Sequence, residues 1–244
     1  MSLSSLQEIA EFEHKIINLV RAAMGTTLKS IMVEGSYGTY DHIPGYSDYD
    51  LAIITNDKHE GRIPGMKELG KSARVDLQWV FCSYQDILNR IDNNCFATRF
   101  VSNMRLILFK ESCRIIDGKD FTKCIPEVSV MTQRDLGEEL RAQYLYATNP
   151  RKAWNIFLRE PRKWCNYIIN MANSLLLSKG VIVRKSEIAD QLKVHFPGFN
   201  DIDSVLYAVE LRRTQEVLSL STEQTADLNC RLESFLEAYR IAVF

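Results

Sequence analysis

Two aspartates, Asp48 and Asp50, lie two residues apart at the start of a short apolar run over residues 51–55. The run has the length and composition of a strand, and residues i and i+2 of a strand share a face. Two carboxylates held this close repel each other, and a hard divalent cation such as Mg²⁺ between them relieves the repulsion. The spacing therefore predicts a metal site with Asp48 and Asp50 as ligands.

A third carboxylate, Asp76, lies in the segment with the clearest alternation of apolar and polar residues, 73–81. This alternation predicts a strand with Asp76 on its polar face. Three carboxylates that converge on one sheet edge are the ligand set of a two-metal site for phosphoryl or nucleotidyl transfer. We expect Asp48, Asp50 and Asp76 to be catalytic residues and metal ligands; the alternative for Asp76 is an exposed strand carboxylate facing Arg74 or solvent.

Gly35 and Ser36 follow a predicted strand at 30–34 and precede Asp48 by an eleven-residue stretch. Glycine lets the backbone approach a phosphate closely, and a helix that starts here would present N–H groups and a hydroxyl to it. We expect Gly35 and Ser36 to bind a nucleotide's phosphates close to the metal ligands. A role for Ser36 as a helix cap is compatible with this.

These motifs resemble the signature of the polymerase beta nucleotidyltransferase superfamily, in which a strand ending in Gly-Ser is followed by Asp-x-Asp and a third Asp. Within it, the chain is most similar to the antibiotic (aminoglycoside) nucleotidyltransferases, such as kanamycin nucleotidyltransferase. The matching segments, within residues 30–90, are Gly35-Ser36-Tyr37-Gly38, Gly45-Tyr46-Ser47-Asp48-Tyr49-Asp50, Arg74-Val75-Asp76-Leu77-Gln78 and Asp86-Ile87-Leu88.

The resemblance implies a mixed-sheet nucleotidyltransferase domain and a helical domain that completes the acceptor pocket. It also implies Mg²⁺-dependent transfer of AMP, or another nucleoside monophosphate, from ATP or another NTP to a hydroxyl group. Many relatives carry an arginine shortly after Gly-Ser, whereas this chain has Tyr37, Gly38 and Thr39. Contacts to the triphosphate must then come from elsewhere in the chain.

The second half of the chain offers cations and carboxylates for the remaining roles. Residues 149–185 hold eight Lys and Arg residues and one acid, Glu160, and a basic helix face there would suit a triphosphate. A solvated helix surface is the alternative. For the general base that takes the acceptor proton, the candidates are Asp76, Glu138 and Glu139.

The acceptor follows from the resemblance only as a class: a small hydroxylated molecule, such as an aminoglycoside-like antibiotic. Two alternatives stay open, transfer to a macromolecule (protein or tRNA) and a non-catalytic nucleotide-sensing module. Antibiotic relatives are often dimers, so a homodimer is one option for this chain. Four tyrosines near the site, at positions 37, 40, 46 and 49, either stack on a base or sugar or pack in the core.

Composition limits the class of protein. The chain has 244 residues, 46% hydrophobic and 25% charged, with a formal net charge of −1. This charge balance argues against a protein that coats nucleic acid or an acidic membrane, although the basic stretch at 149–185 leaves a local RNA contact open. Six scattered cysteines without a C-x-x-C pair, and a charged N-terminus without a long apolar run, predict a cytoplasmic protein.

The hydrophobic period divides the chain. Up to residue 128 it alternates between helical and strand-like stretches, and from 129 to 244 it is almost wholly helical. We therefore predict an α+β fold, with a nucleotidyltransferase domain at 1–128 and a helical substrate-binding domain at 129–244. The expected strands are 30–34, 51–55, 73–81 and 114–117, with a polar loop at 56–70, and the expected helices are 5–23, 83–92, 133–148, 151–178, 186–194, 201–219 and 222–242.

Overall fold

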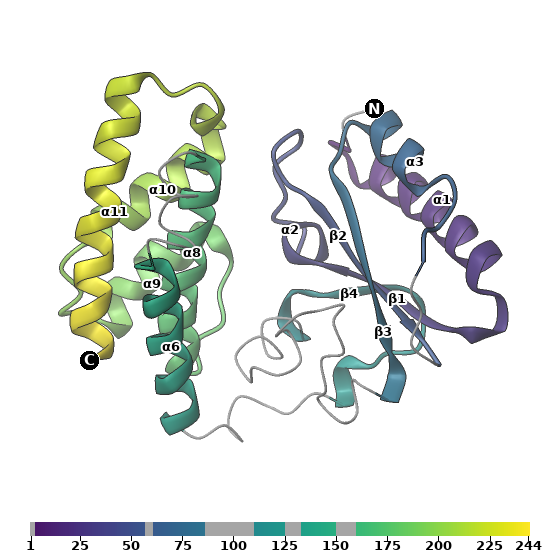
Figure 1. Ribbon diagram of the computed structural model, residues 1–244, viewed down its shortest axis with the longest axis horizontal. Coiled ribbons are helices and arrows are strands. Elements are labelled where there is room, and N and C mark those ends of the chain that lie inside the picture. Colours follow the sequence, from purple (N-terminus) through teal and green to yellow (C-terminus); the bar gives the residue numbers. More distant parts are fainter. Residues whose placement is uncertain (1–2, 57–60, 86–109, 125–132, 150–159) are drawn as a thin grey trace. The chain divides into compact units, whose positions relative to one another are not determined.

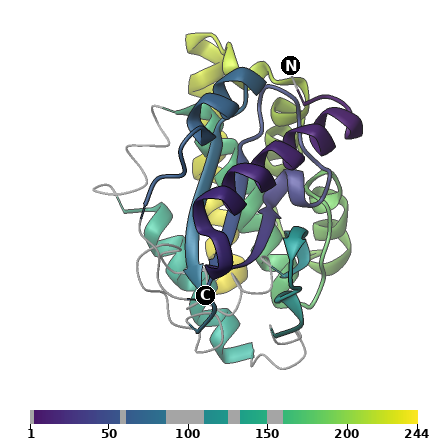
Figure 2. The same ribbon diagram turned by 90° about the vertical axis from the view of Figure 1, so that its right-hand side faces the viewer.

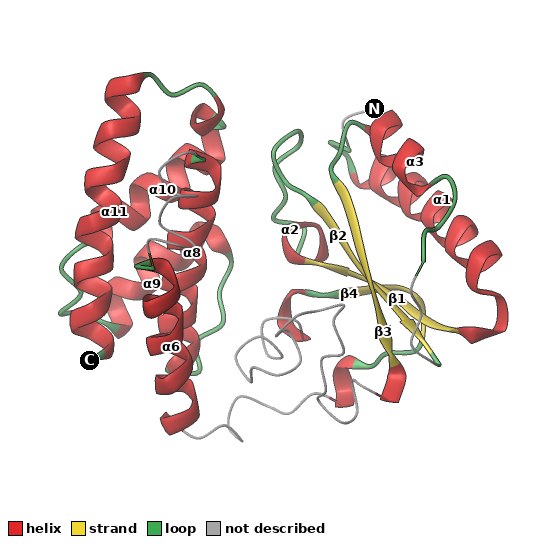
Figure 3. Ribbon diagram, in the orientation of Figure 1, coloured by secondary structure: helices red, strands yellow, loops and turns green. Residues whose placement is uncertain are grey.

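The computed structural model describes residues 3–56, 61–85, 110–124, 133–149 and 160–244 (Figure 1). The chain divides into two compact units, Met1–Glu127 and Val128–Phe244. Strands occur in the first unit, and the described part of the second is helical, as the colours of Figure 3 show. The predicted α+β class is confirmed. Ser83, the first residue of the helix expected at 83–92, instead ends a strand. Residues 86–92 of that helix, with the Asp86-Ile87-Leu88 segment, and the first part of the helix expected at 151–178 fall outside the described residues.

A four-stranded mixed sheet forms the centre of the first unit, in the order β3-β2-β1-β4. β1 pairs antiparallel with β2 and with β4, whereas β2 and β3 run parallel. The strands are β1 (Leu28–Glu34), β2 (Tyr49–Thr55), β3 (Leu77–Ser83) and β4 (Arg114–Gly118).

Helices α1 (Leu6–Met24) and α3 (Met66–Ala73) contribute to the core on one face of this sheet. In Figure 2, α1 lies across the strands. Ser5 caps α1 by accepting from the Glu8 amide, and the helix ends at Gly25, as its sequence pattern predicted. The buried face of α1 comprises Ile9, Phe12, Glu13, Ile16, Val20 and Met24. The apolar residues of this face pack on strand residues such as Ile31, Val33, Leu51 and Ile53.

Two sequence expectations in this unit are wrong. The predicted loop at 56–70 contains the first part of α3, and the predicted strand at 73–81 starts only at Leu77. α3 ends because Arg74 adopts a left-handed backbone conformation, with φ of 55°, and the chain turns there into β3. The alternation begins before the strand does, so Asp76 lies in the connection that enters β3.

The second unit packs its helices around α8 (Pro161–Ser178), which contacts α6, α9, α10 and α11. The other helices are α6 (Gln133–Ala147), α9 (Ile188–His195), α10 (Ile202–Thr214) and α11 (Thr222–Val243). Pro161 occupies the first position of α8, where its missing N–H leaves no hydrogen bond broken. α10 ends at Thr214, earlier than the predicted 219, because Gln215 is left-handed with φ of 61°. None of the described helices is long and apolar enough to span a membrane.

Candidate active site

Asp48 and Asp50 lie at the entrance of β2, as predicted. Asp50 is the second residue of the strand, Asp48 directly precedes it, and both are half-buried. The side chains of Tyr49, Leu51 and Ile53 belong to the core beneath α1 and α3. Because successive side chains of a strand point to opposite faces, Asp48 and Asp50 lie on the face away from α1.

The strands beside β2 place further polar groups next to Asp50. Glu34, the last residue of β1, pairs with Asp50 across the antiparallel ladder, and Gln78 of β3 pairs with it on the other side. Paired residues share a face, so Glu34, Asp50 and Gln78 form a row across the sheet. Glu34 is only 7% exposed. Glu34 is not among the predicted site residues, because its proximity to Asp50 depends on the register between β1 and β2.

Asp76 is fixed next to β2 by its backbone. Its carbonyl oxygen accepts from the Tyr49 amide at 2.9 Å, and the next residue, Leu77, pairs with Tyr49 in the parallel ladder. The side chain is exposed, and its Oδ2 accepts a hydrogen bond of 3.0 Å from Nε2 of Gln78. Tyr49 and Leu77 are paired on neighbouring parallel strands. Asp48 and Asp76 are the residues that immediately precede them.

The Gly-Ser motif forms a tight turn beside Asp50. α2 (Gly35–Gly38) is a single helical turn that follows β1 directly, and Gly35 has a φ of +61°, which favours glycine. A Cβ atom on Gly35 would lie 3.6 Å from Oδ2 of Asp50, so the backbone at this residue runs alongside that carboxylate. Ser36 is half-buried. The structure thus brings Gly35 and Asp50 together, as the motif spacing predicted.

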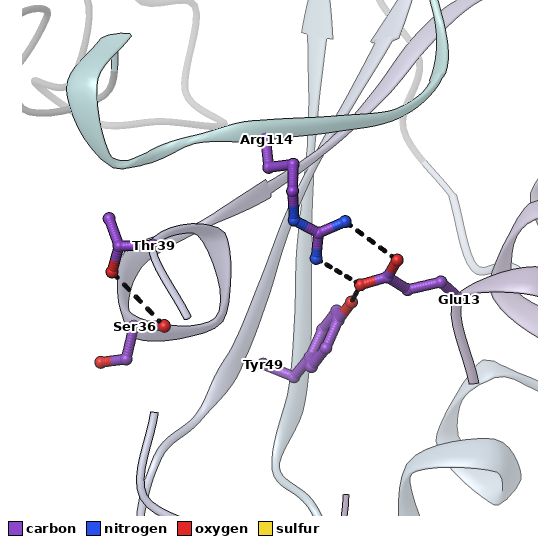
Figure 4. Close-up of polar contacts among 5 residues, drawn as sticks. All are labelled: Glu13, Ser36, Thr39, Tyr49 and Arg114. Atoms are coloured by element: carbon purple, nitrogen blue, oxygen red, sulfur yellow. Dashed lines mark hydrogen bonds and ion pairs between the residues drawn. The ribbon is translucent and has the colours of Figure 1, made fainter. Parts of the chain in front are cut away.

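The same turn is packed against the segment before β4. A Cβ atom on Gly38 would lie 2.0 Å from the carbonyl oxygen of Ser112 and 2.7 Å from that of Val33. Only glycine fits this contact without displacement of the backbone. In Figure 4, Thr39 closes the turn by donating to the carbonyl oxygen of Ser36.

Asp48 and Asp50 have the donor chemistry of magnesium ligands. Over the described ranges, no group of three or more His, Cys, Asp or Glu side chains is arranged to hold a metal ion by itself. Asp48 and Asp50 provide hard oxygen donors from one strand face. Mg²⁺ is usually held by one or two carboxylates together with substrate phosphates and water, so this pair suits it.

A polar cluster joins Glu13 of α1, Tyr49 of β2 and Arg114 of β4 (Figure 4). The Tyr49 hydroxyl donates to Oε1 of Glu13 at 2.6 Å. Arg114 of β4 donates to both carboxylate oxygens of Glu13, at 3.0 Å and 2.5 Å. Burial raises the pKa of Tyr49 above its ordinary value, and the nearby Glu13 carboxylate raises it further. Sequence reasoning missed this cluster, because Glu13 and Arg114 are 101 residues apart.

The tyrosines around the site separate into two groups. Tyr37, Tyr46 and Tyr49 are 1%, 3% and 0% exposed, which makes them core residues. Tyr37 lies between Tyr49 and His42, with ring centroids at 4.6 Å and 4.2 Å, and burial raises its pKa to about 12. Tyr40 is 51% exposed and is the one exposed residue of the four.

The candidates from the second unit lie on several elements. Glu138 and Glu139 are on α6, exposed and half-buried respectively. Among the cations of 149–185, Lys163 pairs with Glu160 at 2.8 Å, and Nζ of Lys179 lies 5.5 Å from the centroid of the Phe196 ring. Arg151, Lys152 and Arg159 lie outside the described residues. The roles of these residues remain predictions.

Comparison with known proteins finds a likeness in structure and none in sequence. No family model and no curated protein matches the chain. Spectinomycin adenyltransferase AAD(9) from Enterococcus faecialis, in a crystal structure with ATP and spectinomycin, superimposes with a TM-score of 0.58 at 12% identity. The match covers 94% of this chain and 98% of that one. A nucleotidyltransferase-like protein from Exiguobacterium sibiricum also matches, at 13% identity over 96% of this chain and 74% of that one, with a TM-score of 0.30.

The likeness to the spectinomycin enzyme concerns the fold and extends through both units, because it covers nearly all of either chain. The shared fold agrees with the resemblance that the Gly-Ser and Asp-x-Asp motifs indicated.

Proposed function

We propose that the chain is a nucleotidyltransferase that transfers AMP, or another nucleoside monophosphate, from an NTP to a hydroxyl group of a small acceptor. The observation that carries the proposal is the juxtaposition of Asp48 and Asp50 with the Gly35 turn at one end of β2. A phosphate-binding turn beside a pair of carboxylates is the arrangement that a metal-bound triphosphate needs. The fold shared with an adenyltransferase agrees with this.

In the proposed site, Asp48 and Asp50 hold Mg²⁺, and the α2 turn at Gly35 and Ser36 receives the phosphates. When bound, Mg²⁺ supplies positive charge that offsets the charge of the triphosphate and orients it. The acceptor oxygen attacks the α-phosphorus, the bond from that phosphorus to the bridging oxygen breaks, and pyrophosphate leaves. The acceptor thereby gains one nucleoside monophosphate and loses one proton.

Asp76 is the residue we propose to take that proton. Its backbone is hydrogen-bonded to Tyr49, between the two proposed metal ligands, while its side chain is exposed. An acceptor hydroxyl can therefore reach the carboxylate, which a general base requires. Asp76 does not form a group of three possible metal ligands with other described residues, which supports this role over that of a third metal ligand. Glu138 and Glu139 remain the alternatives for the base.

For the acceptor we propose a small molecule with hydroxyl and ammonium groups, of the aminoglycoside-like class. Carboxylates such as Glu138 and Glu139 on α6 are suited to ammonium groups. The neighbouring enzyme was crystallised with ATP and spectinomycin, which puts an antibiotic of that kind first among the candidates.

The test is mass spectrometry of acceptor panels incubated with ATP, Mg²⁺ and the protein. The panels contain aminoglycosides, spectinomycin, lincosamides, nucleosides, tRNA and protein, and the control is Asp50→Asn. We expect one small molecule to gain the mass of AMP with the native protein, and the adduct to be at least a hundredfold less abundant with the variant. An adduct on tRNA or protein would show that the acceptor is a macromolecule and not a small molecule. No adduct despite Mg²⁺-dependent ATP binding would favour a nucleotide-sensing module.

A further inference from the structure

The residue between the two aspartates is anchored from behind the sheet. Tyr49 is fully buried, and its side chain lies on the face opposite to Asp48 and Asp50. Its hydroxyl donates to Glu13 of α1 at 2.6 Å, while its ring packs edge-on against Phe12, with centroids 5.1 Å apart. The backbone that carries both aspartates is thus held by a directional hydrogen bond as well as by packing.

Arg114 connects this anchor to the α2 turn. Its guanidinium donates to both oxygens of Glu13, and its Cζ atom lies 4.6 Å from the centroid of the Tyr40 ring. Tyr40 follows the α2 turn by two residues and is left-handed, with a φ of 57°. One guanidinium therefore connects α1, β4 and the end of the α2 turn, and it reaches β2 through Glu13 and Tyr49.

Packing alone does not require these groups. The cluster lies at the border of an apolar core, where removing charges from water is costly, and apolar side chains of similar volume are often as stabilising as a buried ion pair. What charged and hydrogen-bonding groups add is direction: a bidentate guanidinium–carboxylate contact fixes both distance and orientation. The contacts fix two elements. One is the α2 turn, which contains Gly35 and Ser36, and the other is the start of β2, where Asp48 and Asp50 lie.

We propose that Glu13, Arg114 and Tyr49 form a positioning cluster that sets the distance and orientation of the Asp48–Asp50 pair relative to the α2 turn. This inference rests on the proposed function, since it concerns how the metal–nucleotide complex is bound. None of the three residues acts as a ligand or a base. Groups that orient metal ligands from outside typically contribute 10- to 100-fold to metal affinity or activity.

The cluster is tested by isothermal titration of ATP at a series of Mg²⁺ concentrations, with Tyr49→Phe as the first variant. The change removes one hydroxyl and keeps the ring. We expect the Mg²⁺ concentration that gives half-maximal ATP binding to rise about tenfold. Tyr239→Phe is the matched control, because Tyr239 is also fully buried and donates its hydroxyl to Gln143 within the helical unit, at 3.2 Å. It should leave the Mg²⁺ dependence unchanged.

A second variant separates positioning from stability. The double change Glu13→Leu with Arg114→Met removes both charges together, so that neither is left unpaired. We expect the Mg²⁺ concentration that gives half-maximal ATP binding to rise about tenfold in the folded double variant, as in Tyr49→Phe. Binding equal to that of the native protein in both variants would overturn the positioning role and leave the proposed function standing. Absence of ATP binding by the native protein at every Mg²⁺ concentration would overturn the proposed function, and the positioning role with it.

Discussion

The ion pair between Glu13 and Arg114 makes a quantitative prediction about the stability of the first unit. The Glu13 side chain is 11% exposed and that of Arg114 is 23% exposed. Glu13→Leu leaves the guanidinium and the Tyr49 hydroxyl without their acceptor. Breaking a fully buried pair costs about 3–5 kcal/mol, and the partial exposure of Arg114 lowers the expected loss to about 2–3 kcal/mol. Arg114→Met leaves a less exposed carboxylate unpaired and should cost a similar amount.

The double variant should lose much less than the sum of the two single changes, because it leaves no unpaired charge. We expect a loss of about 2 kcal/mol, because the buried Tyr49 hydroxyl is left without its acceptor, and hence a coupling energy of about 3 kcal/mol between the two positions. Hydrogen exchange of the β1 and β2 amides measures the opening free energy of this unit directly. Additive losses would show that the side chains do not act as a pair. Single losses below about 1 kcal/mol would show that the pair contributes no more than a surface salt bridge.

Three further predictions concern Gly38 of the α2 turn, the buried Tyr49 and the proposed base Asp76. Gly38→Ala should destabilise the first unit by about 2–3 kcal/mol in urea unfolding, since its Cβ would overlap the Ser112 carbonyl, whereas Gly137→Ala, with open space around it, should stabilise α6 by up to about 1 kcal/mol. Equal effects would refute the close contact. Because burial raises the pKa of Tyr49, the stability that its neutral form contributes is complete below about pH 10 and falls above it, by up to about 1.4 kcal/mol per pH unit. Unfolding free energies from pH 9 to 11.5 should therefore fall less steeply in Tyr49→Phe than in the native protein, and an unchanged slope would contradict this. Asp76→Asn should lower the rate of AMP transfer about 10²- to 10⁴-fold and leave Mg²⁺-dependent ATP binding intact, whereas loss of that binding would make Asp76 a metal ligand.

Local sequence pattern was sufficient where an element carries its own signal. α1 has an apolar stripe, a capping box and a terminal glycine, and its observed bounds, Leu6–Met24, agree closely with the predicted 5–23. The motif around Asp48 and Asp50 likewise lies where a strand begins. In both cases the deciding interactions join residues that are close in sequence, which a pattern of types and spacings records.

Pattern failed where tertiary contacts decide the outcome. α3 has eight residues, one of them glycine, and is stabilised by packing Met66 and Ala73 into the core rather than by helix propensity. The alternation around Val75 continues across the end of this helix, so the strand was predicted to begin too early. Glu34 beside Asp50, and Glu13 beside Arg114, depend on strand register and on contacts across the fold, for which the local sequence holds no signal.

The central claim, that Asp48 and Asp50 hold a metal ion for a bound nucleotide, is tested most directly by calorimetric titration of ATP with and without Mg²⁺. The native protein should bind ATP when Mg²⁺ is present and at least a hundredfold more weakly when it is absent. In the double variant Asp48→Asn with Asp50→Asn, Mg²⁺ should no longer strengthen binding, because amide oxygens lack the charge that a hard cation requires. Mg²⁺-dependent binding that persists unchanged in this variant would contradict the assignment of the site.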